Sequence, residues 1–197
     1  MKKNENVNFF PRMVAFIIDL LLVGIVCSLF SLPFVNEDNS EKLSNEVNEI
    51  VSKAANQEIS LKTYFTELVP LVYESERQNG VYTIIMLLVS IFYYIVYQFR
   101  TGQTIGKKVF NIKLVSNDGD LTMNQLVFRG LIINSILFTL LTFVFLLFSN
   151  SKTFFIADLT LASLYYLILL ISSFMIIYRK DHRGLHDVIC NTKVVKC

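Results

Sequence analysis

A carboxylate lies inside the first apolar segment of the chain, RMVAFIIDLLLVGIV, where Asp19 stands among Phe, Ile and Leu residues. An ionised side chain inside a membrane helix costs about 2.5–3.5 kcal/mol on insertion scales, so it normally faces protein or water. Such a group can bind a proton or a cation, and it can equally hold helices together through hydrogen bonds. The residue types leave both roles open for Asp19.

Arg12 stands at the near end of the same segment, seven residues before Asp19. Seven residues return to nearly the same face of a helix, but they are about 10 Å apart along the axis. This distance is long for a direct ion pair, so we expect Arg12 to reach toward the lipid headgroups. Asp19 must then find its partners on other helices.

Polar residues occur at a matching depth in the other apolar segments. Each segment has a basic residue at one end and polar side chains one to two turns deeper. These candidate partners of Asp19 are Tyr93, Tyr94, Asn134, Ser135, Ser172 and Ser173. The pattern predicts a polar layer in one half of a helix bundle, with Asp19 as its formal charge and Arg12 as an electrostatic modulator.

A second charged group follows the last apolar segment, in the sequence RKDHRGLHD. His182 and His186 are spaced like a metal-binding pair on a helix, but Gly184 between them weakens a helix. The three cysteines match no zinc pattern. We therefore predict no metal and no cofactor, and instead a cytoplasmic gate or ion-pair network of Asp181, Arg183, His186 and Asp187.

Four long apolar segments must position these groups. The chain is 53% hydrophobic, with a mean hydropathy of +0.51. A helix of about 20 apolar residues spans a bilayer. The candidate spans are Phe9–Phe34, Val81–Phe99, Leu131–Phe148 and Ile156–Tyr178. The sequence therefore predicts an all-α membrane protein, a bundle of four transmembrane helices forming one domain over residues 1–197.

The charges around these segments predict the orientation. Basic residues, among them Lys2 and Lys3, gather in the N-terminal segment, between the second and third spans, and in the C-terminal segment. The loop 36–80 instead carries nine acidic residues against four basic ones. The positive-inside rule then places both termini in the cytoplasm and the loop outside a bacterial cell membrane. Asp158 is expected near the start of the fourth helix, complementing its N-terminal dipole.

Three connecting segments show local patterns. Apolar stripes that begin at Ser40 and at Ser60 predict two amphipathic helices in the loop 36–80, and Pro70 is expected to bend or end the second helix. These helices form either an external lid or partner site, or a solvated spacer. Alternation over Val109–Val115 predicts a strand, which pairs with a short β-prone segment beginning at Thr192. Thr122 and Gln125 form a capping box that opens a helix running through Arg129 into the third span.

The stretch GQTIGKK, residues 102–108, is one residue short of a phosphate-binding loop and has Lys108 where Ser or Thr should stand. We predict a turn at the membrane surface instead. Lys107 and Lys108 would then lie near anionic headgroups.

Three stretches occur in the order PRMVAFIIDLLL, TGQTIGKKVFNIKLV and RGLHDVICNTKVV. Together they resemble the RDD family of bacterial membrane proteins, which is named for one arginine and two aspartates. The resemblance implies that Arg12 is the arginine and that Asp19 and Asp187 are the aspartates. It covers nearly the whole chain except the acidic loop, and it implies a polytopic membrane protein for which transport is the usual suggestion.

The leading functional prediction is a transport component for a proton, a cation or a small solute, in which Asp19 responds to the ion. Four spans are few for a transporter, so a pathway between subunits of a homo-oligomer would also fit. The alternative is a non-transporting scaffold or accessory subunit that binds an extracytoplasmic protein through the loop 36–80. The spans contain no Ser–His, H-E-x-x-H or paired carboxylate motif, so we expect no enzyme, and beyond the lipid bilayer we expect no nucleic-acid partner.

Overall fold

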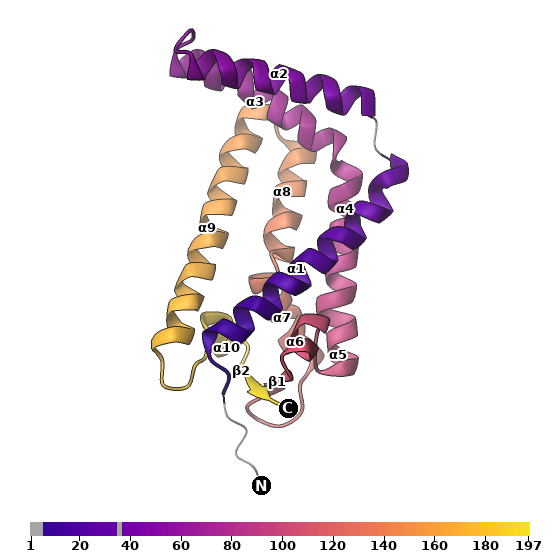
Figure 1. Ribbon diagram of the computed structural model, residues 1–197, viewed down its shortest axis with the longest axis vertical. Coiled ribbons are helices and arrows are strands. Elements are labelled where there is room, and N and C mark those ends of the chain that lie inside the picture. Colours follow the sequence, from indigo (N-terminus) through magenta and orange to yellow (C-terminus); the bar gives the residue numbers. More distant parts are fainter. Residues whose placement is uncertain (1–5, 35–36) are drawn as a thin grey trace.

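The computed structural model of the chain describes residues 6–34 and 37–197 (Figure 1). Lys2, Lys3 and Asn36, which entered the charge argument and the loop boundary, lie outside the described residues. The fold is mostly helical, and its two ends hold different elements. We call them the sheet end, which holds the two strands, and the hairpin end, which holds α2 and α3.

Among the described residues, three helices are long and apolar enough to span a membrane. The first consists of α1 (Phe9–Ser31) and a short turn, η1 (Leu32–Phe34). The second is continuous through α4 (Gly80–Ile91), a π-helical segment η2 (Phe92–Tyr97) and α5 (Gln98–Thr101). The last is α9 (Ser151–Tyr178). The number of spans becomes four if a bent pair of helices, α7 and α8, counts as one.

That bent pair corrects the prediction of one continuous third helix. Helix α7 (Met123–Ile133) ends at Asn134, and α8 (Ile136–Phe148) begins after Ser135 at an angle of 61°. Ser135 adopts the left-handed region, with φ of 55°. Asn and Ser side chains compete for backbone hydrogen bonds and favour helix ends, which explains why the helix breaks here although the flanking residues are apolar.

Helices α2 (Glu37–Ala55) and α3 (Leu61–Gln78) form a hairpin that lies across one end of the bundle (Figure 1). The two amphipathic helices predicted in the loop are confirmed. Ser60 caps α3 by accepting a hydrogen bond from the Thr63 backbone N–H at 3.2 Å. Pro70 lies within α3 and does not end it.

The sheet end carries the predicted antiparallel pair of strands, but the first strand begins at Ile112 and not at Val109, because the chain up to Val109 forms a short helix. Strand β1 (Ile112–Ser116) pairs with β2 (Thr192–Lys196), with Leu114 opposite Val194. Two short helices, α6 (Ile105–Val109) and α10 (Leu185–Ile189), lie beside the strands. The predicted capping box of α7 is present, since Thr122 and Gln125 satisfy each other's backbone N–H groups.

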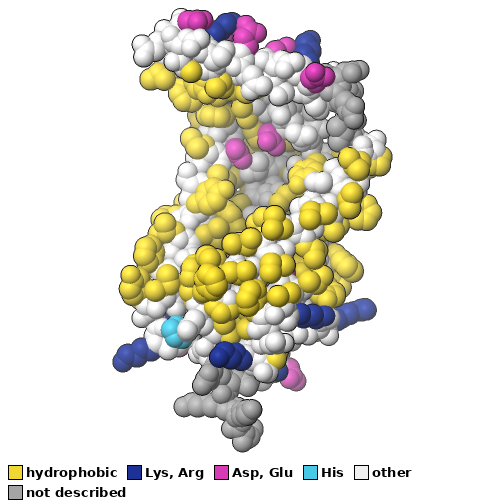
Figure 2. All heavy atoms as spheres, in the orientation of Figure 1, with side chains coloured by type: hydrophobic (Ala, Val, Ile, Leu, Met, Phe, Trp, Pro, Cys, Tyr) yellow, Lys and Arg dark blue, Asp and Glu magenta, His cyan; other side chains and the backbone are white. Residues whose placement is uncertain are grey.

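The surface between the two ends is apolar. Figure 2 shows hydrophobic side chains over the middle of the molecule, Lys and Arg side chains at both ends, and most of the acidic side chains in the hairpin-end half. Large apolar side chains on the spans are widely exposed, among them Leu20, Leu29, Leu88, Ile156 and Leu170. Apolar surface of this extent on long helices is what a lipid environment requires.

Candidate functional site

Asp19 lies on α1 and is almost completely buried, at 2% exposure. Its carboxylate accepts three hydrogen bonds from outside its own helix. The Tyr93 hydroxyl and the Gly106 backbone N–H donate to Oδ1 at 2.6 and 2.7 Å, and the Thr104 hydroxyl donates to Oδ2 at 2.5 Å. The carboxylate therefore ties α1 to the π-helical segment and to the first turn of α6.

Gly106 explains how α6 comes so close to α1. A Cβ at this position would overlap the backbone oxygen of Ala15 and lie 2.9 Å from Oδ1 of Asp19. Only glycine leaves room for the backbone N–H to reach the carboxylate. Thr104 also caps α6, since its hydroxyl accepts from the Lys107 N–H at 3.4 Å.

Asp187 on α10 is the centre of a second charged cluster. It is fully buried and lies between two guanidinium groups, with Arg12 at 2.7 Å from Oδ2 and Arg129 of α7 paired with Oδ1. The Gly184 N–H also donates to Oδ2, at 3.1 Å. Burial opposes ionisation, but the Arg129 and Arg12 charges together hold the pKa of Asp187 well below its ordinary value. This cluster joins α1, α7 and α10.

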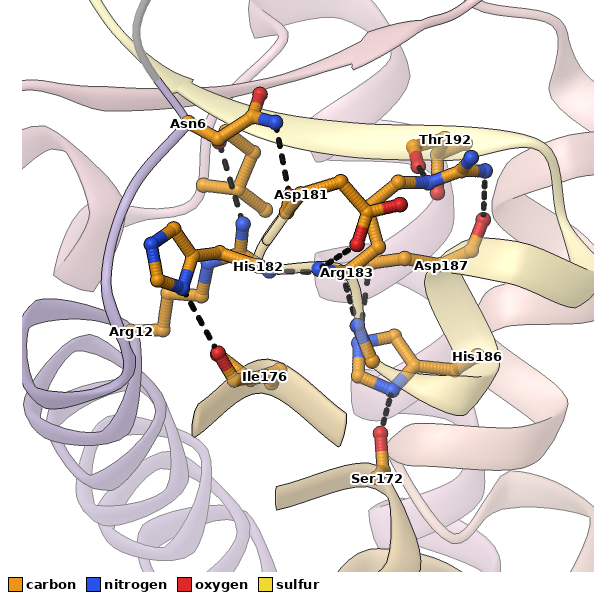
Figure 3. Close-up of polar contacts among 12 residues, drawn as sticks. Asn6, Arg12, Ser172, Ile176, Asp181, His182, Arg183, His186, Asp187 and Thr192 are labelled. Atoms are coloured by element: carbon orange, nitrogen blue, oxygen red, sulfur yellow. Dashed lines mark hydrogen bonds and ion pairs between the residues drawn. The ribbon is translucent and has the colours of Figure 1, made fainter. Parts of the chain in front are cut away.

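His186 is buried next to this cluster. Its Nδ1 lies 2.6 Å from the Ser172 hydroxyl of α9, and its Nε2 lies 3.4 Å from Asp187 (Figure 3). Burial, reinforced by the Arg129 charge, lowers the pKa of His186 to about 3. The ring is therefore neutral, and the tautomer that fits both contacts carries its proton on Nε2.

The other charged residues of the C-terminal segment have local partners. Arg183 donates to the backbone oxygens of Thr192 and Asp187, both at 3.0 Å, and so fastens α10 to β2. Asp181 pairs with Arg179 at 2.8 Å near the surface, and this hydrogen bonding lowers the pKa of Asp181 to about 2. The His182 ring points away from His186 and donates to the Ile176 carbonyl (Figure 3).

A cavity of about 280 Å³ lies between these two clusters, in the sheet-end half of the bundle. We call it the sheet-side cavity. Its polar lining includes Asp19, Tyr94, Gln98, Asn134, Ser172, Ser173 and His186, and its cationic lining consists of Arg12, Lys107 and Arg129. Its apolar walls come mainly from α1 and α9, with Phe9, Met13, Phe16, Leu169 and Ile176.

Lys107 points into this cavity, which corrects the prediction that it lies near the headgroups. Its Nζ is 3.0 Å from the side-chain oxygen of Gln98, in the amide orientation that satisfies both groups. Burial lowers the pKa of Lys107 to about 7, and the Arg129 charge adds to this effect. Lys108, the next residue, is exposed and donates to the Tyr97 hydroxyl at 2.8 Å.

A second hollow of about 420 Å³ lies in the hairpin-end half, between α3, α4, α8 and α9. We call it the hairpin-side groove. Figure 2 shows this face hollowed, with acidic side chains inside, and Glu76 and Asp158 line it together with Ser135, Thr142 and Tyr165. The role predicted for Asp158 at a helix start is wrong, because α9 begins at Ser151, and Asp158 instead accepts from the Thr142 hydroxyl at 3.4 Å.

The family model described as the RDD family matches residues 7–191. The chain belongs to the RDD family. No curated protein and no solved structure matches it. In this RDD protein the three residues that the resemblance implied fall into two separate clusters, with Asp19 in one and Arg12 and Asp187 paired in the other.

The predicted polar layer of this RDD protein is thus divided. Tyr93 donates to Asp19, whereas Tyr94, Asn134, Ser172 and Ser173 line the sheet-side cavity with it. Ser135 lies across the helix break and lines the hairpin-side groove. Arg12 does not act on Asp19 through a direct contact, since it pairs with Asp187.

Sequence reasoning did not assign Thr104, Gly106, Lys107 or Arg129 to the site. The stretch TGQTIGKK held the signal, because a glycine between a capping threonine and two lysines permits close approach of a backbone N–H to an anion. Arg129 gave no local signal beyond its place near the start of an apolar segment. In the part of the chain that the structure describes, no group of three or more His, Cys, Asp or Glu side chains is arranged to hold a metal ion.

Proposed function

We propose that this RDD protein is a membrane transport component that moves a proton, alone or together with a small solute, through two hollows in series. The helix break carries this proposal. Asn134, on one side of the break, lines the sheet-side cavity, and Ser135, on the other side, lines the hairpin-side groove. The two hollows therefore approach each other at adjacent residues, from opposite halves of the bundle.

A helix break at this position is more consistent with a transport pathway than with a bundle that has only a structural role. Within a membrane, backbone that leaves the helical hydrogen-bond pattern is tolerated only where it is buried in protein or lines a water-filled space. Transporters use such discontinuous helices at their binding sites. The Tyr165 hydroxyl donates to the Ile133 carbonyl at 3.0 Å and so satisfies backbone next to the break. We assign Tyr165 as part of the barrier between the two hollows.

In this proposal the two clusters have different roles. Asp19, with three donors on its oxygens, fixes α6 against α1, and Lys107 in the same cavity carries the proton. The Arg12–Asp187–Arg129 cluster closes the sheet end, which we assign to the cytoplasm of a bacterial cell on the positive-inside rule.

The experiment is proton flux into proteoliposomes, followed with a lumenal pH dye under an imposed potential, with and without sodium. The test variant is Ser173→Phe, which fills the sheet-side cavity, and its matched control is Ser163→Phe on an exposed position of the same helix. We expect flux above that of empty liposomes for the wild type and the control, and its loss in Ser173→Phe. Flux no higher than in empty liposomes, or equal flux in both variants, would contradict the proposal.

A non-transporting scaffold is the alternative, and the α2–α3 hairpin favours it. Val51, Leu61 and Phe65 on the hairpin are exposed apolar side chains beside an acidic surface, as an extracytoplasmic partner site would be. This alternative predicts no flux and a partner that is lost when the hairpin is replaced by a short linker. It would also leave the Ser173→Phe variant fully able to bind that partner.

A further inference from the structure

We propose that the sheet-side cavity is an anion site: it binds the oxyanion of a molecule with an apolar body, and Lys107 takes up a proton as that anion enters. The chemistry required is a single negative charge on a carboxylate or phosphodiester with hydrocarbon attached. A free apolar acid and an anionic phospholipid both supply it. The inference concerns what the cavity binds and stands apart from whether the chain moves a solute.

The charges around the cavity do not balance when Lys107 is protonated. Asp187 already pairs with both Arg12 and Arg129, and His186 beside them is neutral. With Asp19 held by neutral donors, protonated Lys107 leaves the five charged groups with one positive charge in excess. A monovalent anion restores neutrality.

Two cationic side chains on the cavity wall have donors that no anionic group of the protein accepts from. Within the part of the chain that the structure describes, no ion pair joins Lys107 to a carboxylate, and its Nζ has the neutral amide of Gln98 as a partner. The Nε of Arg12 is buried and, among the described residues, has no hydrogen-bond partner. Buried donors normally have acceptors, so two cationic side chains on the wall of one cavity call for an acceptor that the protein does not supply.

The walls of the cavity suit an apolar body. Phe9, Met13 and Phe16 of α1 face Leu169 and Ile176 of α9 across it. Figure 1 shows these two helices diverging from the sheet end toward the hairpin end. A pocket with apolar walls and a few convergent polar groups is the usual form of a small-molecule site.

Proton uptake follows from the surroundings of Lys107. The charged and titratable groups around it are Arg12 and Asp19 of α1, Tyr94 of the π-helical segment, Arg129 of α7, and His186 and Asp187 of α10. Burial lowers the pKa of Lys107 to about 7, so near neutral pH a large fraction of the empty cavity holds the amine uncharged. An anion beside the amine favours its charged form and raises its pKa, so binding takes up a proton.

The test is calorimetric titration of hexanoate into the purified chain in phosphatidylcholine nanodiscs, in two buffers of different ionisation enthalpy. We expect uptake of about one proton per hexanoate near pH 8 and close to none near pH 6, where Lys107 is already charged. Lys107→Gln should weaken binding by at least about tenfold and abolish the uptake. The matched control, Lys108→Gln, changes the neighbouring exposed lysine and should leave both unchanged.

Lys107→Arg separates the anion site from a merely structural lysine. Arginine stays charged at every pH used, so this variant should bind hexanoate near pH 8 with no proton uptake. Equal binding by the Lys107→Gln and Lys108→Gln variants, or uptake that persists in Lys107→Gln, would overturn the inference, as would the absence of hexanoate binding.

A second arm identifies the source of the anion. If phosphatidylglycerol in the nanodiscs weakens hexanoate binding to the wild type but not the residual binding to Lys107→Gln, the lipid headgroup occupies the same site. If affinity is unchanged by phosphatidylglycerol, the site takes the free acid.

Discussion

Gly106 shows how much of the site depends on one missing side chain. The Asp19 carboxylate reaches a backbone N–H only because α6 touches α1 at Ala15. Asp19 could be expected to draw donors from other helices, because an isolated carboxylate among apolar side chains is costly. Of its three donors, the depth of Tyr93 in its own segment predicts the first. The Thr104 hydroxyl and the Gly106 backbone N–H lie 85 and 87 residues away, and only tertiary packing brings them to the carboxylate.

We predict that Gly106→Ala lowers the stability of the protein by about 1–3 kcal/mol, because the new methyl group overlaps backbone that cannot move freely. The chain has no Trp, so unfolding is best followed with a thiol-reactive dye on the buried Cys27 and Cys190. Gly24→Ala on α1 is the control, since nothing lies within 4 Å of a Cβ there. If the two variants melt at the same temperature, the close contact between α6 and α1 is not real.

The pairing of Arg12 with Asp187 illustrates what residue spacing cannot provide. The two residues are 175 positions apart, and local rules assign Arg12 only to its own helix and to the lipid surface. A membrane-facing arginine and one that closes a buried cluster have the same sequence context. The difference depends on where α10 folds back, which is a tertiary event.

Helix α10 places two buried titratable residues, His186 and Asp187, against the bundle. His186 is neutral in the folded protein, with its pKa lowered to about 3, whereas an unfolded histidine titrates near 6.5. Below about pH 6.5 the unfolded chain therefore binds a proton at this histidine and the folded chain does not. The free energy of unfolding consequently decreases as the pH falls. Asp187 adds little to this loss above about pH 4, because its carboxyl is ionised there in the folded and in the unfolded chain alike.

We predict that the wild type loses about 2–3 kcal/mol more stability than His186→Gln between pH 7 and pH 4.5. Thermal melting followed by circular dichroism at both pH values measures the difference. His182→Gln, which changes the other histidine of the chain, should keep the wild-type pH dependence. A parallel loss in all three proteins would mean that His186 is not buried as a neutral ring.

Several elements could be predicted because their signals are local. The strands, the capping box at Thr122 and the two amphipathic helices of the hairpin follow from alternation, spacing and stripes within short windows. The break at Asn134–Ser135 could not be predicted, because apolar residues continue on both sides and the helical signal outweighs two polar residues. Whether two polar residues inside an apolar segment break the helix depends on their tertiary environment. Here that environment is the two hollows and the Tyr165 hydroxyl.

On the scale of the whole molecule, the two halves of the bundle differ in charge. The sheet-side cavity has three cationic side chains on its walls, and the hairpin-side groove has two carboxylates. The composition and the positive-inside rule predict a helical membrane protein and its orientation in the membrane. They do not predict the two hollows, which depend on how α1, α4, α7, α8 and α9 pack. In the proposed transport component these hollows open to opposite sides of the membrane and meet at the break between Asn134 and Ser135.

The most direct measurement is the sided reactivity of single cysteines at the break. Asn134→Cys and Ser135→Cys are made in a chain whose Cys27, Cys190 and Cys197 are replaced, and a membrane-impermeant maleimide is applied to each side of sealed vesicles. A chain that retains Cys197, exposed at the sheet end, marks the side on which that end lies. We predict that Asn134→Cys reacts from the same side as Cys197 and Ser135→Cys from the opposite side. Reaction of both from one side, or of neither, would contradict the account.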